Sequence, residues 1–216
     1  MKRASYLFLA IATLLMFIGC GWFNEDDLDI SYTEEIPINI PRIDSAMVCP
    51  DGVDCAAASI PSPMDRDLNP VALDVEIDIV EATGQPELSQ YTGRFKEISI
   101  SRIEYEFTEN TLTFDLPETT IYLGPLGSTS PEDDGVVPLA VLPETPAMQA
   151  ASGTAQITEA NRQATSDLIK TLQTSAIIAA QPRVKMGQPF PPRGAAEVKA
   201  TIFVTFVANP ADAINR

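Results

Sequence analysis

Residues 196–208, AEVKATIFVTFVA, carry the most regular strand pattern in the chain. Val198, Ile202 and Phe206 fall on one face of an extended backbone, because successive side chains of a strand point to opposite faces. Phe203 falls on the other face and makes it partly apolar as well. A strand that is apolar on both faces is typical of a central position in a sheet. The pattern therefore predicts that residues 196–208 form a central strand.

An earlier run, residues 28–40, also alternates. Apolar side chains occupy most of its even positions from Leu28 to Ile40, a period of two that is typical of a strand with one buried face. Pro37 lies within the run and Pro41 follows it, and proline has no N–H group to donate to a neighbouring strand. We therefore expect residues 28–40 to form an edge strand.

Every second side chain in residues 73–79 is apolar, which predicts another half-buried strand. The side chains between them are Asp74, Glu76 and Asp78. Three carboxylates on one strand face could chelate calcium, but such rows repel one another and are more often simply solvated. The same two interpretations apply to the acidic cluster at residues 132–134. This cluster lacks the ligand spacing of a calcium-binding loop, which favours solvated carboxylates.

A long strand is expected at residues 95–107. Its apolar side chains change from even to odd positions at Ser101-Arg102, and such a change of parity predicts a β-bulge or a bend. Residues 109–110, Glu-Asn, then suggest a tight connection to a second alternating run. We therefore expect residues 95–116 to form a β-hairpin.

One amphipathic helix is expected at residues 159–172, with Thr158 as its N-cap. The apolar side chains predicted to share its buried face recur at three- and four-residue spacing: Ala160, Ala164, Leu168, Ile169 and Leu172. Because this helix lies alone between strands, we expect it to cover one end or edge of a sheet.

About seven to nine short strands and one late α-helix predict a mainly β fold, an antiparallel immunoglobulin-like β-sandwich. We assign residues 28–210 to a single sandwich domain and residues 211–216 to a C-terminal tail. The proline-containing connections at residues 56–72 and 187–194 are expected to be exposed.

The first twenty residues, MKRASYLFLAIATLLMFIGC, have a different character. Lys2 and Arg3 precede an apolar run from Leu7 to Ile18. That run is too short to cross a bilayer of about 30 Å as a helix of about 20 residues. A cleaved signal peptide at residues 1–19 is therefore the better interpretation.

The end of this segment, Phe17-Ile18-Gly19-Cys20, resembles the lipobox of bacterial lipoproteins. In that family the cysteine receives a diacylglyceryl group and becomes the first residue of the mature chain. The resemblance implies lipid attachment at Cys20, typically with palmitate, a lipidated tether at residues 20–27 and a place in the bacterial cell envelope. Gly21 is not the aspartate that marks inner-membrane retention, so the outer membrane is the expected destination. The alternative is an ordinary signal peptide that happens to end in cysteine.

Cys49 and Cys55 flank the residues Pro50-Asp51-Gly52-Val53-Asp54. Pro-Asp-Gly favours a tight turn that brings the two thiols together, and disulfides persist in the oxidising compartments that exported proteins enter. We therefore expect a local Cys49–Cys55 disulfide. Metal binding is a weaker alternative, since two thiolates with no histidine make half a zinc site, and a redox role would favour a CxxC spacing.

The chain has 30 acidic and 14 basic residues, a net charge of −16, and no histidine. Such a charge repels nucleic acid and anionic headgroups, so membrane attachment would have to come from the acyl chains on Cys20. The lack of histidine removes the usual general base and the commonest ligand of zinc. With one cysteine lipidated and two bridged, we expect no catalytic residue, no metal site and no cofactor.

Three functions remain open. The leading hypothesis is a non-enzymatic, lipid-anchored envelope protein whose sandwich binds a protein or a surface polymer. The alternatives are a periplasmic carrier of an apolar small molecule and a glycan-acting enzyme with a carboxylate pair. An interior apolar cavity of roughly 300 Å³ or more would favour the carrier, and two facing carboxyl groups in a cleft would favour the enzyme.

Overall fold

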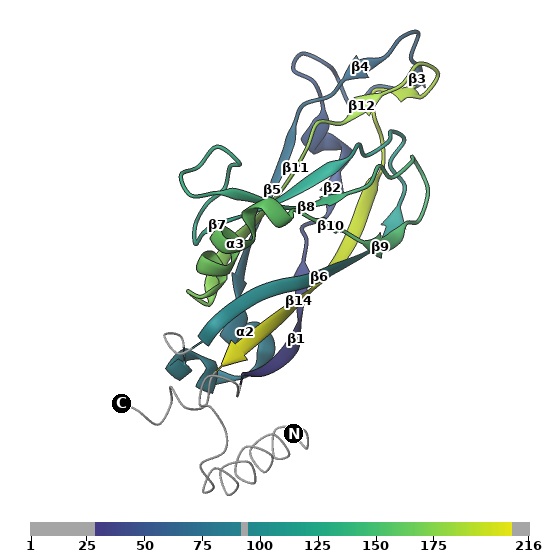
Figure 1. The fold of residues 1–216 in the computed structure, drawn as a ribbon. Helices are drawn as coiled ribbons and strands as arrows, with labels where there is room; N and C mark the ends of the chain where they lie inside the picture. The colour runs from purple at the N-terminus through teal and green to yellow at the C-terminus, as the bar shows by residue number, and fades with distance from the viewer. Residues whose placement is uncertain (1–28, 92–94, 209–216) are drawn as a thin grey trace, which may run out of the picture.

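The computed structural model describes residues 29–91 and 95–208, which fold into two antiparallel sheets (Figure 1). The first sheet has the strand order β1 (Ile30–Asn39), β14 (Ala195–Ala208), β6 (Phe95–Asn110) and β9 (Ser152–Thr154), with β2 (Ile43–Asp44) paired to the start of β14. The second sheet has the order β10 (Gln156–Ile157), β8 (Val137–Leu142), β7 (Thr119–Pro125), β11 (Gln173–Ala180) and β5 (Val71–Asp78). The expected mainly β, antiparallel sandwich is thus confirmed.

The central position predicted for the last strand is confirmed, because β14 pairs with β1 on one side and β6 on the other. Ile202 and Phe206 point into the core and are fully buried. Phe203, on the outer face, is buried under the guanidinium of Arg102, which lies 3.9 Å from the centre of the ring. A cation over an aromatic face therefore covers the apolar outer side of this strand.

The change of parity within β6 is a β-bulge. Arg102 lies opposite Phe203 and Ile100 lies opposite Val204, so Ser101 is the extra residue between them. A bulge shifts the alternation by one residue. As a result Ile100, before the bulge, and Ile103, after it, both face the core, as the sequence predicted.

The two sheets share one hydrophobic core, to which both contribute large side chains. Phe206 of β14 is fully buried and stacks on Tyr32 of β1 with 5.0 Å between ring centres. From the second sheet, Leu123 and Leu139 are equally buried. The shared core makes the described residues one packed unit.

One long side of the sandwich is covered by chain, and we call it the closed flank. The helix α3 (Arg162–Ile169), which follows the 3₁₀ turn η4 (Glu159–Asn161), contacts β6 of the first sheet and β7, β8 and β11 of the second. Beside it, β9 and β10 belong to different sheets and are separated only by the buried Ala155. The helix covers this side of the sandwich, as expected, and one residue carries the chain between the sheets.

The opposite side is the open flank, where β1 and β5 form the sheet edges. Within the described residues, each of these strands pairs on one side only, β1 with β14 and β5 with β11. The short helix α2 (Ile79–Thr83) follows β5 directly and contacts β1. Together with the 3₁₀ helix η3 (Pro86–Tyr91), it lies at the lower end of the molecule in Figure 1. The edge position predicted for residues 28–40 is confirmed for the described part, β1.

The upper end of Figure 1, which we call the ribbon end, holds two short ribbons. They pair β4 (Arg66–Asp67) with β12 (Arg183–Val184), and β3 (Ile60–Pro61) with β13 (Pro189–Phe190). The 3₁₀ helix η2 (Ser45–Val48) leads into this region. Because the ribbons pair residues 56–72 with residues 183–190, the exposure expected for both connections is only partly correct: Leu68 and Pro191, for example, are buried.

The predicted hairpin at residues 95–116 is wrong. β6 pairs with β14 and β9, and residues 111–116 form no strand beside it. Instead of making a turn, Asn110 donates from its side-chain amide to the carbonyls of Pro146 and Gln149. Leu112 and Phe114 are fully buried in an irregular segment. Their alternation reflected burial alone, which does not require a neighbouring strand.

The predicted helix is shorter than expected and is rotated. Ala160 and Ala164 are exposed, and Thr158 forms no side-chain cap hydrogen bond. The buried residues from α3 onward follow the spacing i, i+4, i+7, which forms one stripe on a helix: Thr165, Ile169 and Leu172, with Ser166 beside them. The larger apolar side chains set this rotation, because burying an alanine methyl group removes little surface from water.

Candidate functional site

A concave surface with a volume of about 580 Å³ lies on the open flank. Residues 36–39 of β1 and residues 75–78 of β5 line it. Glu81 and Ala82 of α2 line it as well, together with Leu126 and Gln173 at the ends of neighbouring strands. We call this surface the edge groove, and its volume is typical of a ligand-binding site.

The edge groove runs along the strand edges themselves. Side chains of a strand alternate between its two faces, so a hollow in one face of a sheet is lined by every second residue. Here four consecutive residues of β1 and four consecutive residues of β5 line the groove. Within the described residues neither strand has a partner on that side. The backbone edges of β1 and β5 therefore face the groove.

Acidic side chains dominate the charge of the groove. Glu76, Asp78 and Glu81 are the charged residues among those that line it. Asp74 lies two residues before Glu76 on the same exposed face of β5. The nearest basic residue in the strand register is Lys199 of β14, which lies opposite Asn39. The groove thus presents a negative potential to any ligand.

Asp78 is held in place at the lower end of the groove. Its Oδ1 accepts a hydrogen bond from the Glu81 N–H at 2.9 Å and so caps α2, while its Oδ2 accepts one from Gln173 Nε2 at 2.8 Å. The hydrogen bond from Gln173, followed by the one from the Glu81 backbone, holds the pKa of Asp78 below its usual value. Asp78 is therefore ionised at neutral pH and acts as a fixed acceptor.

The inner wall of the groove is apolar. Ile36, Ile38 and Ile77 line it with side chains that are almost fully buried in the core. Leu126, which follows β7, is 51% exposed at the margin. At the α2 end, Gln85 Nε2 donates to Glu34 Oε1 at 2.6 Å and ties the segment after α2 to β1. The groove therefore combines a rigid apolar wall with an acidic rim.

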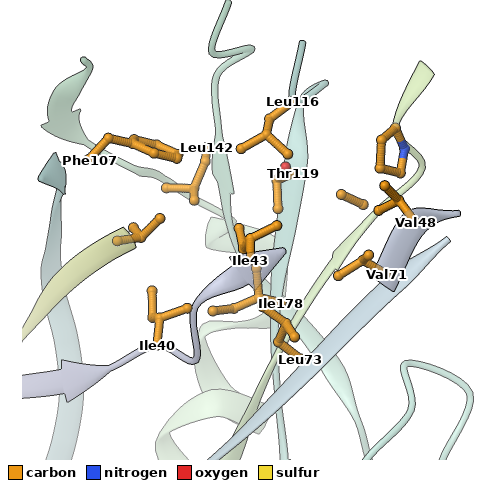
Figure 2. Close-up of a pocket in the computed structure, with 13 residues that line it drawn as sticks. Ile40, Ile43, Val48, Val71, Leu73, Phe107, Leu116, Thr119, Leu142 and Ile178 are labelled. Carbon is orange, nitrogen blue, oxygen red and sulfur yellow. The ribbon is translucent and has the colours of Figure 1, made fainter. Parts of the chain in front are cut away.

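The interior of the sandwich offers much less space. An apolar cavity of about 30 Å³ lies between the sheets. Figure 2 shows side chains that line it, among them Ile43, Val48, Leu73 and Ile178. A cavity of this size holds about one water molecule. This cavity is therefore too small for a small-molecule ligand such as the edge groove could hold.

The ribbon end forms a second exposed surface. Ile60, Met64 and Met186 are 67%, 57% and 71% exposed. They lie close together because the Met186 N–H donates to Asp65 Oδ1 at 2.8 Å and the Gly187 N–H donates to the Ser62 carbonyl. This surface is a protruding tip, whereas the edge groove is concave.

Two basic side chains, Lys185 and Arg193, connect the ribbon end to other parts of the chain. Lys185 Nζ lies 2.6 Å from Asp115 and 2.8 Å from Glu144. Burial raises the pKa of Asp115, but the hydrogen bonds led by that from Lys185 outweigh this effect and lower it. Arg193 donates from its guanidinium to Ser59 Oγ and to the carbonyls of residues 56 and 57. The contacts of Arg193 stabilise the segment that follows the disulfide.

The structure forms the predicted disulfide. The sulfur atoms of Cys49 and Cys55 are bonded, with 6.2 Å between their Cα atoms. The Val53 N–H donates to the Pro50 carbonyl at 3.1 Å, and Gly52 has φ +78°, so the residues between them make the predicted tight turn. Cys20 and the tether at residues 20–27 lie outside the described residues, and lipid attachment there stays a prediction.

Neither acidic cluster forms a cation site. The carboxylates of Asp74 and Glu76 lie on the exposed face of β5, and Asp133 accepts from the N–H groups of Thr129 and Ser130 in its own loop. Among residues 29–91 and 95–208, no group of three or more cysteine, aspartate and glutamate side chains could hold a metal ion.

The sequence did not predict the groove, although two of its signals were visible. Pro37 marked β1 as an edge, and the acidic row marked one face of β5 as exposed. What the pattern could not indicate is that these two edges flank one groove, because that depends on pairings between distant segments.

No helix within the described part of the chain is both long and apolar enough to cross a membrane.

No protein-family model matches this chain. No curated protein matches its sequence either. Among solved structures, the chain is similar to the mud crab tombus-like virus structure, with 9% identity, a TM-score of 0.35, and coverage of 86% of this chain and 85% of that one. It is also similar to the decameric BFDV capsid protein, with 10% identity, a TM-score of 0.34, and coverage of 82% and 99%. Both TM-scores lie below 0.5.

Proposed function

We propose that this protein is a non-enzymatic, lipid-anchored protein of the bacterial cell envelope whose β-sandwich binds a protein or a surface polymer. The acyl chains on Cys20 attach it to the membrane, with the outer membrane as the destination. The lipobox resemblance of residues 17–20 supports this anchor. The net charge of −16 leaves no other means of attachment to an anionic membrane surface and argues against nucleic acid as a partner.

The observation that carries the binding role is the contrast between the two hollow regions of the sandwich. The edge groove has about 580 Å³ of open, surface-accessible space, and the interior cavity has about 30 Å³. A carrier of an apolar molecule needs an enclosed space of a few hundred Å³. The geometry therefore favours a ligand bound along the outside of the sandwich over one enclosed within it.

The hydrogen bonds of Asp78 also argue against this residue as the acid of a glycosidase. A glycosidase needs one carboxyl group that stays protonated near neutral pH and can act as a general acid. Asp78 is held by two hydrogen bonds that lower its pKa. It is suited to accept hydrogen bonds from a ligand and unsuited to donate a proton.

The anchor is tested by the variant Cys20→Ser. We expect it to accumulate as unprocessed precursor, or as soluble protein after cleavage elsewhere, whereas the native chain fractionates with membranes through its acyl chains. Mass measurement of the N-terminal peptide identifies the modification. A native mature chain of unmodified mass that begins at a residue other than Cys20 would overturn the anchor.

The binding role is tested by photo-crosslinking in intact cells. A photoreactive amino acid replaces Leu126, at the margin of the edge groove, and in a matched control it replaces Met148, which is 69% exposed and does not line the groove. We expect a discrete adduct with an envelope protein or polymer from position 126 and none from position 148. Equal adduct patterns from both positions, or no adduct from 126, would contradict the binding role of the groove.

A further inference from the structure

We infer that the edge groove binds an extended, basic segment of a partner protein, which adds as a strand to the edge of β5 that has no partner strand within residues 29–91 and 95–208. This inference rests on the proposed binding function and names the chemistry of the partner. Three properties of the groove lead to it: a backbone edge, an acidic row on one face of that edge and an apolar wall on the other.

The backbone edge supplies the first part of the recognition. Along an edge strand, every second residue directs its N–H and C=O groups away from its only partner. Residues 75–78 of β5 pair with β11 on one side, and their other side lines the groove. An extended peptide placed about 4.8 Å away would satisfy these groups, as in strand addition to other sheet edges.

The acidic row supplies the charge preference. Asp74, Glu76 and Asp78 all point to the outer face of β5. An added strand places its own outward side chains directly beside them, where opposite charges attract and like charges repel. A partner with lysine or arginine at every second position therefore fits this edge.

The apolar wall fixes what lies between those basic residues. The inward side chains of the added strand would face Val75 and Ile77 of β5 and Ile36 and Ile38 of β1. Because strand side chains alternate between faces, basic and apolar residues must alternate in the partner segment. A shift of the added strand by one residue would bring its apolar side chains beside the carboxylates, so the pattern sets the register.

The same charges argue against a second copy of this chain as the occupant. The protein has a net charge of −16, and its own β5 edge carries three carboxylates. Two such edges side by side would place like charges opposite each other. Charged residues and proline on an edge, here the acidic row and Pro37, are devices that prevent self-association. The groove therefore discriminates by charge between copies of itself and a basic partner.

The test uses the purified full chain in a non-ionic detergent and the peptide Lys-Val-Lys-Val-Lys-Val-Lys, with blocked ends. Its control has the same composition in the order Lys-Lys-Val-Val-Val-Lys-Lys. We expect the alternating peptide to bind roughly tenfold more tightly than the control in fluorescence anisotropy, since only it can present both faces correctly. Equal affinities would overturn the inference.

Two protein variants localise the binding. Asp74→Asn with Glu76→Gln should weaken binding of the alternating peptide roughly fivefold, and it spares Asp78, which caps α2. Asp51→Asn with Glu118→Gln removes the same charge from exposed positions that do not line the groove, and should leave binding unchanged. Equal weakening by both pairs would mean attraction to the overall charge and would overturn the site.

Two N-methylated peptides test the backbone pairing. In one peptide the backbone nitrogens of the lysines carry methyl groups. In the other the backbone nitrogens of the valines do. A strand added to one edge uses the N–H groups of only one of these sets, so one peptide should lose binding and the other should keep it. Equal effects of the two sets would overturn strand addition. If the peptides fail while crosslinking at position 126 still captures an envelope partner, the basic-strand inference falls and the proposed function stands.

Discussion

The two flanks of this sandwich differ in how their sheet edges are covered. Each flank is a place where two sheet edges end and the core would meet water. On the closed flank, α3 contacts both sheets and the chain crosses between them at Ala155. On the open flank, β1 and β5 keep free edges within the described residues, and acidic side chains line the hollow between them.

The two flanks differ in how much apolar surface they bury and in the charge that they carry. Ile169 and Leu172 are fully buried beneath the closed flank and contribute apolar burial. Glu76 and Glu81 at the open flank bury no comparable surface and bring like charges together. An edge that is kept open by mutually repelling carboxylates is suited to a ligand that neutralises them.

Truncation of the closed flank should have the largest effect. Ile169→Ala leaves a cavity in the core, and we expect a loss of about 2–5 kcal/mol in the free energy of unfolding, measured by urea denaturation. The matched change on the open flank, Leu126→Ala, removes a side chain that is 51% exposed and should shift stability by less than about 0.5 kcal/mol. Similar losses of unfolding free energy in both variants would contradict the proposed difference between the flanks.

The disulfide provides a test away from both flanks. Replacing Cys49 and Cys55 with serine opens a short loop at the ribbon end, and the chain-entropy relation gives a loss of about 2.4 kcal/mol. We expect lower stability in urea but unchanged affinity for the alternating basic peptide, because neither cysteine lines the edge groove. A loss of peptide binding in this variant would show that the open flank depends on the ribbon end.

A smaller effect is expected where the open flank meets α2. Asp78→Ala removes the side-chain cap of that helix and should cost about 1 kcal/mol. Asp74→Ala, on the same face of β5 but without a capping role, is the control and should cost less. Equal losses would show that the cap does not hold the end of the groove.

The same carboxylate predicts a pH dependence. The pKa of Asp78 is lowered in the folded protein, first by the hydrogen bond from Gln173. Its contribution to stability is therefore complete above the unfolded value of about 3.9 and is lost as the pH falls through the lower folded value. The Glu81 amide resonance should follow this titration by NMR, and the Asp78→Asn variant should abolish it. A transition of that resonance near neutral pH in the native chain would contradict the assignment.

The smallest effect should have the opposite sign. Asp74→Asn with Glu76→Gln removes neighbouring like charges and should raise the free energy of unfolding by roughly a few tenths of a kcal/mol. The distant pair Asp51→Asn with Glu118→Gln removes the same number of negative charges and should change the free energy of unfolding less. A destabilised acidic-row variant would mean that these carboxylates serve the fold of the open flank.

Local alternation predicted the parts of this fold in which burial and strand pairing coincide. It identified β1 as an edge and β14 as central, and it located the bulge at Ser101 because one skipped residue leaves a visible change of parity. The same signal produced the incorrect hairpin at residues 95–116. There Leu112 and Phe114 are buried without a strand partner, and the adjoining backbone bonds to residues 193 and 195, far away in sequence.

The candidate site was less predictable than the fold. The edge groove joins residues 36–39 to residues 75–78, Leu126 and Gln173. The residue pattern within each segment does not predict that these segments lie side by side. The disulfide, by contrast, was predictable from Cys49, Cys55 and the turn between them, because a short loop is governed by its own residues.

The position of β14 has a consequence for how this protein acquires its structure. Its register pairs Ile30 with Ala208, so the first and last strands described lie side by side, and β6 reaches β1 only through β14. Folds dominated by such distant pairings have a high contact order and fold slowly, because a long loop must close before the contacts that reward it can form. The first sheet therefore cannot assemble until the last strand, residues 195–208, has been synthesised. Until residues 195–208 are available, β1 and β6 have no strand between them, whereas all strands of the second sheet lie earlier in the chain.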